Sequence, residues 1–590
     1  MLSYRKLAMR VLGRPLHTER GNKSPRPASQ RAAAFVLTAA MLTTLAAPAF
    51  AATWRIEDGD ITVKAGETEG TNKVSQGTNK DVVDTNTIIT NQKTDTASSH
   101  TVTIDAGKDK VDVTLDNVNI KAKTDSGSAL TSKGDVTLTL KGDNHLTGGN
   151  GSSSGIISHF GSSGISGSGS LTITGGENDS LTAQGGDGSL GGGGITIDRG
   201  SLTISGGTVN AASGDGGSNA GMYGSGIYIN IGSLTVSGGT VNATGSNGGG
   251  NYGGDGIYSS SSVAISGGKV KAAGGDSKDG YGGDGIRSDG GVTISGNTVT
   301  ANGGDGGKVG GYGIRSSSGG ITISGGTVNA NGGNSDYSSG GSGIWSFDVT
   351  ISGSTVNTTG GNGGNGGGNG IISLDHVAIS GGTVKAAGGN GGNGSRSDVG
   401  NGIISSVIDL SGSLELTAKA GSPNGKALSQ AGHELDLNDI KDKLDPGAKV
   451  TTTDANGKVN QVSIPRPVEP EKPVIPEESS SSSDGGSAAP SAPASFLPGL
   501  TVTDKDGQRI SYTSTQSGNT LTVCVGRFTA SFRISLAALR QLRAEGIEAI
   551  TFQTILCSTT LSVDELLAMG GEDAEAVLTH RFTDSSLTVG

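Results

Sequence analysis

Apolar and polar residues alternate in short runs between about residue 170 and residue 421, and the runs repeat at a nearly constant spacing. The clearest copy, residues 321–330, reads Ile-Thr-Ile-Ser-Gly-Gly-Thr-Val-Asn-Ala and leads into a glycine-rich stretch. Alternation with a period of two places the apolar side chains on one face of a strand. A fixed period of about 29 residues indicates a solenoid, in which each repeat buries its apolar face against its neighbours. The first glycine of the pair recurs 28 to 32 residues apart, at Gly206, Gly238, Gly267, Gly296, Gly325, Gly353 and Gly381.

The runs predict strands rather than helices. Each holds three or four residues before a Gly-Gly pair, which is too short and too glycine-rich to nucleate a helix. Three short strands per repeat predict an all-β fold, a parallel β-helix in which like residues stack in aliphatic ladders. The composition alone would be typical of disorder, since 107 of 590 residues are glycine and only 32% are hydrophobic. The repeat changes that picture, because each coil needs only a few inward aliphatic residues.

The Gly-Gly pair marks a corner of the coil. Its second position holds asparagine at Asn297, and asparagine is the commonest non-glycine residue with a positive φ. We therefore predict a left-handed residue there, with Ser354 marking a slightly different corner. A serine precedes the pair in every copy, and we expect its hydroxyl to satisfy backbone groups of the turn. These serines are Ser205, Ser237, Ser266, Ser295, Ser324, Ser352 and Ser380.

Residues 1–51 have the order of parts of a bacterial secretory signal peptide. A basic region, residues 1–31, precedes the apolar run 32–42, and residues 49–51 form an Ala-Phe-Ala cleavage pattern. The apolar run is too short and too rich in alanine and threonine to predict a membrane span. We therefore expect a secreted or cell-surface bacterial protein, with no membrane insertion after the signal is removed.

The charge of the remaining chain narrows the range of partners. Without residues 1–51, 35 Lys and Arg face 53 Asp and Glu, which is a net charge of −18. A surface this acidic argues against nucleic acid and anionic membranes as partners. It favours neutral polymers, or acidic polymers bridged by cations.

Composition divides the chain further. Residues 52–150 contain strand-like runs without the repeat, and we expect them to form an N-terminal cap and the first coils, before the β-helix repeats of residues 151–421. Residues 422–463 are expected to cap the other end. Residues 464–497 are rich in proline and then in serine, which is typical of an extended linker.

The last segment, residues 498–590, predicts a small α+β domain. Residues 521–525 alternate as a strand, Ser535 is placed to cap an amphipathic helix, and residues 562–565 form a capping box. Cys524 and Cys557 are the only cysteines and fall on predicted strands. Export permits a disulfide between them, and two buried thiols are the alternative. Attachment to the cell envelope and docking of a partner protein are both open roles for this domain.

Several stretches of the chain resemble a known family. Residues 113–120 (Val-Thr-Leu-Asp-Asn-Val-Asn-Ile), residues 135–147 and the recurring Leu-Thr-Ile-Ser-Gly-Gly-Thr-Val-Asn-Ala units are similar to coils of secreted bacterial β-helix carbohydrate-binding domains, of the pectate-lyase-like superfamily. The resemblance covers about residues 60–440 and leaves out the linker and the C-terminal domain. It implies a right-handed β-helix that binds plant-type polysaccharide, including acidic pectic chains, with bound calcium and without catalysis.

A tyrosine recurs in five successive glycine-rich loops. A row of phenol rings spaced by the coil rise is suited to stacking on the faces of sugar rings. The alternative is that each tyrosine covers its own loop. The five predicted carbohydrate-binding residues are Tyr223, Tyr252, Tyr281, Tyr312 and Tyr337.

The segment Gly-Gly-Asp-Gly-Ile occurs at residues 253–257 and again at residues 282–286. Asp255 and Asp284 are therefore equivalent in adjacent coils, with their carboxylates about 5 Å apart. Like charges at that spacing repel unless they are protonated, separately hydrogen-bonded or bridged by a cation. Calcium takes the oxygen ligands that carboxylates and a glycine-rich backbone supply, so the pair is a candidate calcium site, with solvated loop acids as the alternative. Weaker candidates are Asp215, Asp276, Asp279, Asp305 and Asp336.

Together these features predict a secreted or cell-surface carbohydrate-binding protein that holds plant-type polysaccharide, cellulose or acidic pectic chains, along the β-helix surface, with calcium as a candidate cofactor. An adhesin or structural surface rod is the first alternative, and a polysaccharide-cleaving enzyme of the pectate-lyase type is the second. We do not expect an enzyme, because no position of the repeat gathers several charged residues for acid–base work. Arg287 and Arg315, in adjacent coils, are expected to be outward and solvated.

Overall fold

The structure is a computed structural model in which two compact units are present, residues 1–470 and 471–590, and their boundary falls inside the predicted linker. The predicted signal peptide and most of the linker lie outside the described residues. No described helix has the length and apolar character that a membrane span needs. The described residues are 52–466 and 499–589, except for 126, 153–159, 217–223, 249–250, 393–399, 505–507, 511, 518, 526, 528, 555–557, 571–573 and 581–584.

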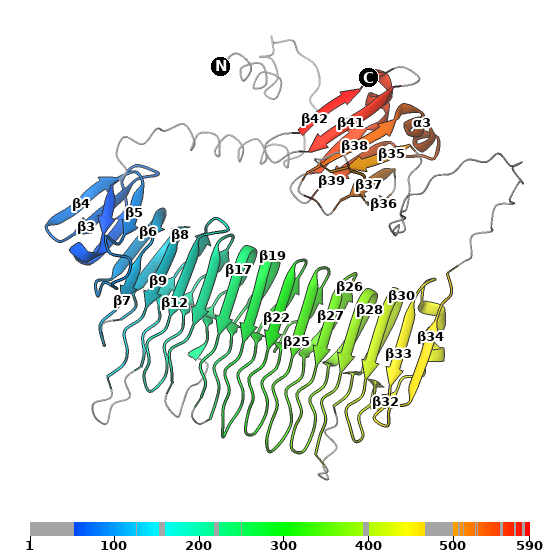
Figure 1. Ribbon diagram of the computed structural model, residues 1–590, viewed down its shortest axis with the longest axis horizontal. Coiled ribbons are helices and arrows are strands. Elements are labelled where there is room, and N and C mark those ends of the chain that lie inside the picture. The colour runs from blue at the N-terminus through cyan, green and yellow to red at the C-terminus, as the bar shows by residue number, and fades with distance from the viewer. Residues whose placement is uncertain are drawn as a thin grey trace, which may run out of the picture. The chain divides into compact units, whose positions relative to one another are not determined.

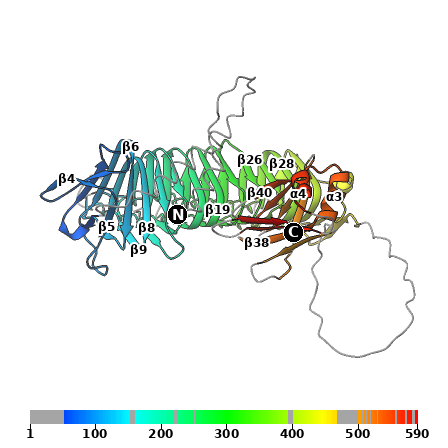
Figure 2. The ribbon, with the colours of Figure 1, turned by 90° about the horizontal axis from the view of Figure 1, so that it is seen from above.

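The first unit is a parallel β-solenoid of about 14 turns, which confirms the predicted fold class (Figure 1). Each strand pairs in parallel with the equivalent strand of the next coil, so that Ile257 pairs with Ile286 and Ile286 with Ile314. Seen from above, the long strands of successive coils lie side by side (Figure 2).

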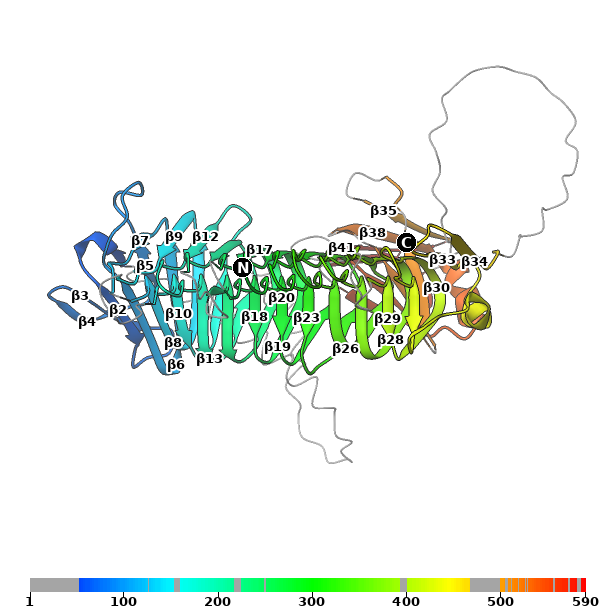
Figure 3. The same ribbon diagram turned by 90° about the horizontal axis from the view of Figure 1, so that it is seen from below.

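Three ladders of strands run through the repeats. The first contains β10 (Ile165–Ser168), β13 (Ile195–Arg199), β16 (Ile227–Ile231), β18 (Ile257–Ser259), β20 (Ile286–Ser288), β23 (Ile314–Ser316), the starts of β26 (Ile344–Ser352) and β28 (Ile371–Ala387), β29 (Ile403–Ser405) and β31 (Leu428–Gln430). Figure 3 labels β18, β20 and β23 of this ladder.

The other two ladders complete each coil. The second contains β11 (Leu171–Thr174), β14 (Leu202–Ile204), the first parts of β17 (Leu234–Thr244) and β19 (Ser262–Ala273), β21 (Gly291–Ile294), β24 (Ile321–Ile323), the later part of β26, the middle of β28 and the start of β30 (Val407–Lys419). The third contains β12 (Ser180–Gln184), β15 (Thr208–Ala212), β22 (Thr298–Asn302), β25 (Thr327–Asn331), β27 (Thr355–Thr359) and β33 (Lys449–Thr453). The later parts of β17, β19, β28 and β30 also belong to the third ladder.

The core is a set of aliphatic ladders along the axis of the coils. In one coil the inward residues Ile286, Val292, Ile294, Val299 and Ala301 are almost fully buried. Burying a Val or Ile side chain stabilises the fold by roughly 1.5–3 kcal/mol, so a few such residues per coil suffice because every neighbour repeats them.

The corner glycines behave largely as the sequence predicts. Asn297 has a φ of 69°, and Gly268 and Gly326, its equivalents in the neighbouring coils, have φ values of 76° and 74°. The left-handed residue predicted at Asn297 is therefore confirmed. The coil with Ser354 differs, because there the preceding Gly353 takes the positive φ of 61°.

The predicted role of the corner serines is wrong for most of them. The serines before the Gly-Gly pair are largely exposed, because they face away from the core. The hydroxyl that satisfies a corner belongs instead to the inward serine that ends the first strand. Ser288 Oγ donates to Ser261 O at 2.8 Å and to Gly291 O at 3.0 Å, and Ser316 Oγ donates to Gly319 O at 2.8 Å.

The glycine-rich loops, which extend below the strand arrows in Figure 1, form a hydrogen-bonded lattice. Gly283 N donates to Gly275 O at 2.9 Å, and Gly304 N donates to Gly283 O at 2.8 Å. A Cβ on Gly283 would lie 1.9 Å from Gly254 O of the preceding coil. The two arms of each loop therefore bond to each other and to the next coil, at a separation that only glycine permits. We call this set the glycine lattice: Gly254, Gly275, Gly283, Gly304, Gly311, Gly333, Gly341, Gly361, Gly368 and Gly389.

Irregular coils and hairpins close both ends of the solenoid. At the N-terminal end β3 (Asn72–Gln76) and β4 (Asn79–Asp84) form an antiparallel pair, and Trp54 Nε1 donates to Oδ2 of Asp84, the last residue of β4, at 2.8 Å. At the other end β33 pairs antiparallel with β34 (Val459–Ser463), beside the 3-10 helix η3 (Leu437–Lys443) and β32 (His433–Glu434). The first coils contain β1 (Thr53–Arg55), η1 (Ile56–Asp58), β2 (Ile61–Ala65), β5 (Thr87–Thr90), β6 (Val102–Asp116), β7 (Asn119–Lys121), β8 (Leu130–Lys141) and β9 (Asp143–Thr147).

The second unit combines two four-stranded sheets with two short helices, which confirms the predicted small α+β domain. The hydroxyls of Ser535 and Ser562 accept from the N–H groups of Ala538 and Glu565, so both predicted helix caps are confirmed. Its elements are β35 (Leu500–Thr503), β36 (Thr513–Ser517), β37 (Thr520–Cys524), β38 (Ala530–Ser535), α3 (Leu536–Ala544), β39 (Ala549–Gln553), β40 (Ser558–Ser562), α4 (Val563–Met569), β41 (Glu575–His580) and β42 (Ser585–Val589).

Of the two cysteines of the second unit, the structure describes Cys524. Cys524 ends β37, and its thiol donates to Gln553 Oε1 at 3.4 Å. Burial raises the pKa of this thiol. Cys557 lies outside the described residues, so the disulfide between them stays a prediction.

Candidate ligand-binding face

One outward position of the first ladder carries large side chains in five consecutive coils. Parallel in-register pairing places these side chains one above another, because each strand repeats the alignment of the strand before it. We call this set the stripe: Tyr228, Tyr258, Arg287, Arg315 and Trp345. In the next two coils the same position holds Ile372 and Ile404.

Rings and guanidinium groups stack along the stripe. The rings of Tyr228 and Tyr258 lie 5.1 Å apart and nearly parallel, and the Arg287 guanidinium lies 5.3 Å from the Tyr258 ring centre. Both tyrosines are buried, and the Arg287 side chain packs against the ring of Tyr258. Contacts of this kind between a cation and an aromatic face are attractive.

The partly exposed end of the stripe is formed by Arg315 and Trp345. The Arg315 guanidinium lies 5.2 Å from the Trp345 ring and 5.3 Å from the Tyr312 ring. Phe347 packs edge-on against Trp345 and is itself exposed, as is Leu374 in the next coil. This part of the face combines a held guanidinium with flat aromatic surface.

The stripe leads at its other end to a cavity of about 320 Å³ beside Tyr228. Phe160 and Leu190 supply apolar surface to this cavity, while Ser163 and Thr196 supply hydroxyls. A mostly apolar hollow with a few polar groups is the usual character of a small-molecule subsite.

Asp255 and Asp284 lie beside the two arginines and are 5% exposed each. Asp284 N donates to Asp255 Oδ1 at 2.7 Å, and Tyr312 N donates to Asp284 Oδ1 at 2.8 Å. Arg287 Nη1 lies 4.0 Å from Asp255 Oδ2, and Arg315 Nη1 lies 3.8 Å from Asp284 Oδ2. The sequence-based expectation of solvated arginines is therefore wrong, since only 24% and 31% of their side chains are exposed.

Burial sets the electrostatics of the two aspartates. Burial, followed by the neighbouring Asp284 carboxylate, raises the pKa of Asp255 to about 7, although Arg287 opposes the rise. Burial also raises the pKa of Asp284, against the opposing effect of Arg315. Two carboxyl groups close together in a poorly solvated place do not both ionise easily.

The pair does not fit the calcium site that the sequence suggested. Calcium takes six to eight oxygen ligands. Here both Oδ1 atoms accept backbone N–H groups, and a guanidinium already faces each Oδ2 atom. Across the described ranges, no group of three or more His, Cys, Asp or Glu side chains is arranged to hold a metal. We therefore do not treat Asp255 and Asp284 as metal ligands.

The five predicted tyrosines do not form one row. Tyr252 and Tyr281 are equivalent, stack at 5.2 Å and are 52% and 42% exposed. Val309 follows Tyr281 at that position, whereas Tyr312 packs against the stripe. Tyr337 is exposed elsewhere on its loop, and Tyr223 lies outside the described residues. The predicted continuous row is therefore wrong, and sugar contact at Tyr252 and Tyr281 stays a prediction.

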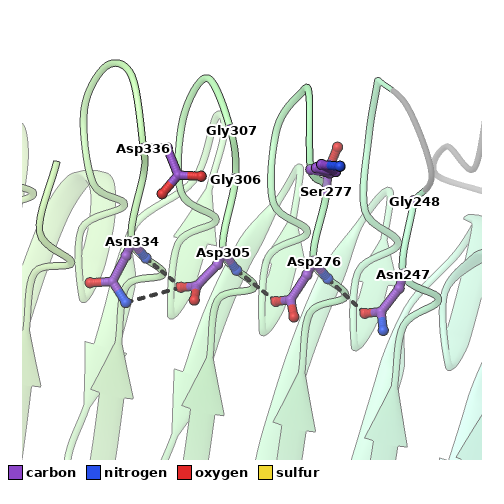
Figure 4. Close-up of a pocket in the computed structure, with 10 residues that line it drawn as sticks. Asn247, Gly248, Asp276, Ser277, Asp305, Gly306, Gly307, Asn334 and Asp336 are labelled. Atoms are coloured by element: carbon purple, nitrogen blue, oxygen red, sulfur yellow. Dashed lines mark hydrogen bonds between the residues drawn. The ribbon is translucent and has the colours of Figure 1, made fainter. Parts of the chain in front are cut away.

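A row of hydrogen-bonded polar side chains, which we call the polar ladder, follows the bases of the loops (Figure 4). The side-chain oxygen of Asn247 accepts from Asp276 N, that of Asp276 from Asp305 N, and that of Asp305 from Asn334 N, at 2.8, 2.8 and 2.6 Å. These residues and Asp336 line a shallow cavity of about 300 Å³. The weaker acidic candidates Asp276 and Asp305 thus have a structural use, since each orders the loop of the next coil.

Comparison with protein-family models, with curated proteins and with solved structures gave no match for this chain.

The sequence analysis did not predict the stripe, although the sequence contains a signal for it. Five successive coils read Gly-Ile-Tyr, Gly-Ile-Tyr, Gly-Ile-Arg, Gly-Ile-Arg and Gly-Ile-Trp at the start of the first strand. A large side chain at one fixed position of a repeat, next to invariant small residues, is a pattern of surface use rather than of packing.

Proposed function

We propose that the protein is a secreted or cell-surface carbohydrate-binding solenoid that holds a polysaccharide chain along the face of its first ladder. The observation that carries the proposal is the run of Arg287, Arg315 and Trp345 in consecutive coils, partly exposed and in register. A flat ring next to oriented guanidinium donors suits a polymer that offers C–H faces and oxygen atoms at regular intervals.

The geometry of a solenoid supports a chain-like ligand. Successive positions of the stripe are separated by about 4.8 Å, the spacing of neighbouring strands, which is comparable to the length of one sugar ring. The exposed pair Tyr252–Tyr281 offers a second stacking surface on the loops. The resemblance to secreted β-helix carbohydrate-binding domains favours plant-type polysaccharide, cellulose or acidic pectic chains, as the ligand class.

Calcium assistance and the absence of catalysis belong to the same proposal. Calcium is a candidate only at the exposed loop acids, since the buried aspartates do not fit it. Export is proposed on the signal-peptide pattern of residues 1–51, and the second unit is proposed to dock the protein to an envelope or protein partner.

Retention on insoluble cellulose and on immobilised polygalacturonate tests the proposal. We expect the full mature chain to be retained on at least one of them, and Trp345→Ala together with Arg315→Gln to be retained at least about tenfold less. Val83→Ala, an exposed apolar residue of the N-terminal cap, is the matched control and should bind like the wild type. Repeating the assay with a chelator tests the role of calcium.

Two outcomes would replace the proposal. No retention on any polysaccharide leaves an adhesin or structural surface rod as the better function. Absorbance from unsaturated uronates, released during incubation with polygalacturonate, would show a lyase instead of a binding protein.

A further inference from the structure

The negative charges of Asp255 and Asp284, beside the stripe, are only partly neutralised by hydrogen bonds and ion pairs with their neighbours. Asp255 Oδ2 is buried and has no hydrogen-bond partner among the described residues. The arginines lie 4.0 and 3.8 Å from the Oδ2 atoms, beyond the roughly 2.7–2.9 Å of a hydrogen-bonded ion pair. A buried carboxylate oxygen without a donor costs free energy that a neutral carboxyl avoids.

We propose that Asp255 and Asp284 together hold one exchangeable proton that sets the charge of the stripe, so that Arg287 and Arg315 bind the carboxylate groups of an acidic polysaccharide when the proton is present. This inference rests on the proposed carbohydrate-binding function and assigns to it a ligand class and a control. It also replaces the predicted calcium ion with a proton at the same two residues.

The balance of charges explains the effect. With both aspartates ionised, three carboxylates, those of Asp255, Asp284 and Asp289, face two guanidinium groups, and the cluster has a net charge of −1. One added proton makes the cluster neutral and removes one carboxylate from competition for the arginines, whose side chains are a quarter to a third exposed. A charge in a poorly solvated place acts on an anionic ligand more strongly than the same charge in open water, so loss of the net negative charge favours binding of the anion.

Among the residues that the structure describes, the charged groups that influence Asp255 are Asp284, Arg287 and Arg315, and both arginines also influence Asp284. Arg287 also lies 3.9 Å from Asp289, which accepts the Tyr258 hydroxyl at 2.7 Å. The pKa of Asp255, raised to about 7, places the change of charge in a range in which the bulk of the acidic surface stays ionised.

The test compares binding at about pH 5.5 and about pH 8.5, on either side of the Asp255 pKa of about 7. Soluble oligogalacturonate and a neutral cello-oligosaccharide are the probes, and the full mature chain is used. We expect oligogalacturonate to bind about tenfold more tightly at the lower pH, and the neutral probe to bind equally at both. Calorimetry in two buffers of different ionisation enthalpy should show proton uptake on binding the acidic probe near pH 7.

Asp255→Asn tests the assignment to this pair. Its side-chain oxygen still accepts from Asp284 N, but it carries no charge at any pH. We expect oligogalacturonate to bind this variant tightly at both pH values and without proton uptake. Asp436→Asn makes the same change of charge on an exposed acid of the C-terminal cap, keeps the acceptor for Asn438 N, and should retain the wild-type pH dependence.

The outcomes separate the two proposals. Binding of oligogalacturonate that is equal at both pH values, or that changes equally in Asp255→Asn and the wild type, overturns the proton site and leaves the carbohydrate-binding function standing. An equal pH effect on the neutral probe also overturns it, because the cause would then not be charge. Failure to bind either probe at both pH values overturns both proposals.

Discussion

The strands of the first ladder and the glycine-rich loops repeat with the same coils, yet they present side chains in different ways. In the strands, pairing fixes the register, so Arg287, Arg315 and Trp345 stand in line although their types differ. In the loops the glycine lattice fixes the backbone, while the tyrosines keep one position only from Tyr252 to Tyr281, and Val309 takes that position in the next loop. A binding surface of constant spacing is therefore built on the strands, and the loops add local features to it.

The largest expected effect comes from the lattice itself. Gly283→Ala would place a methyl group 1.9 Å from Gly254 O, so the loops of neighbouring coils must separate. We expect a loss of more than about 3 kcal/mol in the free energy of unfolding, measured by denaturant titration, together with new proteolytic cleavage in the loops. Gly320→Ala, where the nearest atom lies at 3.5 Å, is the control and should change little. Equal stability of the two variants would show that the loops are not part of the cooperative fold.

The next effect lies where loop and strand meet, at the buried aspartate pair. The pKa of Asp255 is about 7 in the folded protein, above its ordinary value of 3.8, so the folded state binds more protons than the unfolded state between these pH values. Stability from this group is therefore present at low pH and falls as pH rises from about 4 to about 7, by up to a few kcal/mol.

Denaturation midpoints of the wild type and Asp255→Asn at about pH 5 and about pH 8 measure this contribution. We expect the variant to lose the decline toward pH 8 and to exceed the wild type there. Parallel pH profiles of the two proteins would contradict the assignment.

A smaller effect compares the two stacking surfaces directly. Trp345→Ala should weaken polysaccharide binding by roughly 1–1.5 kcal/mol, because it removes the partly exposed aromatic ring of the stripe and the ring that the Arg315 guanidinium contacts. Tyr281→Ala should cost less, since Tyr252 keeps its own exposed ring. Affinity electrophoresis on a soluble polysaccharide gives both values, and a larger loss for Tyr281→Ala would place the main surface on the loops.

The smallest effect is expected at the polar ladder of Figure 4. Asp276→Asn keeps the acceptor for Asp305 N and changes only an exposed charge. We expect a change in unfolding free energy within about 0.5 kcal/mol and unchanged binding, with and without a chelator. Chelator-dependent binding that this substitution removes would identify the loop acids as calcium ligands after all.

Periodicity predicted the backbone of this protein well, because a solenoid converts a local pattern directly into a global arrangement. The alternation in residues 321–330 predicts the strands, the face that points to the core and the position of the corner. Asn297 alone predicts a left-handed backbone conformation at its turn. The capping residues Ser535 and Ser562 were predictable for the same reason, since a cap depends only on nearby residues.

Side-chain contacts between coils were less predictable. Tyr281 and Tyr312 are 31 residues apart, whereas the coils there repeat every 29 or 28, so the row of tyrosines breaks on counting alone. Arg287 forms an ion pair with Asp255, which lies 32 residues earlier in the sequence, and not with Asp284, which is nearer in the sequence. Such contacts depend on side-chain reach and burial, which a repeat spacing does not contain.

The in-register pairing of the first ladder also has a consequence for the evolution of such a protein. Each coil supplies one side chain to the stripe and bonds only to the coils on either side. Duplication or loss of one repeat therefore lengthens or shortens the ligand footprint by one step, with the core unchanged. Exchange of repeats between gene copies reorders tyrosine, arginine and tryptophan along the same frame, so the range of ligands can shift without a new fold.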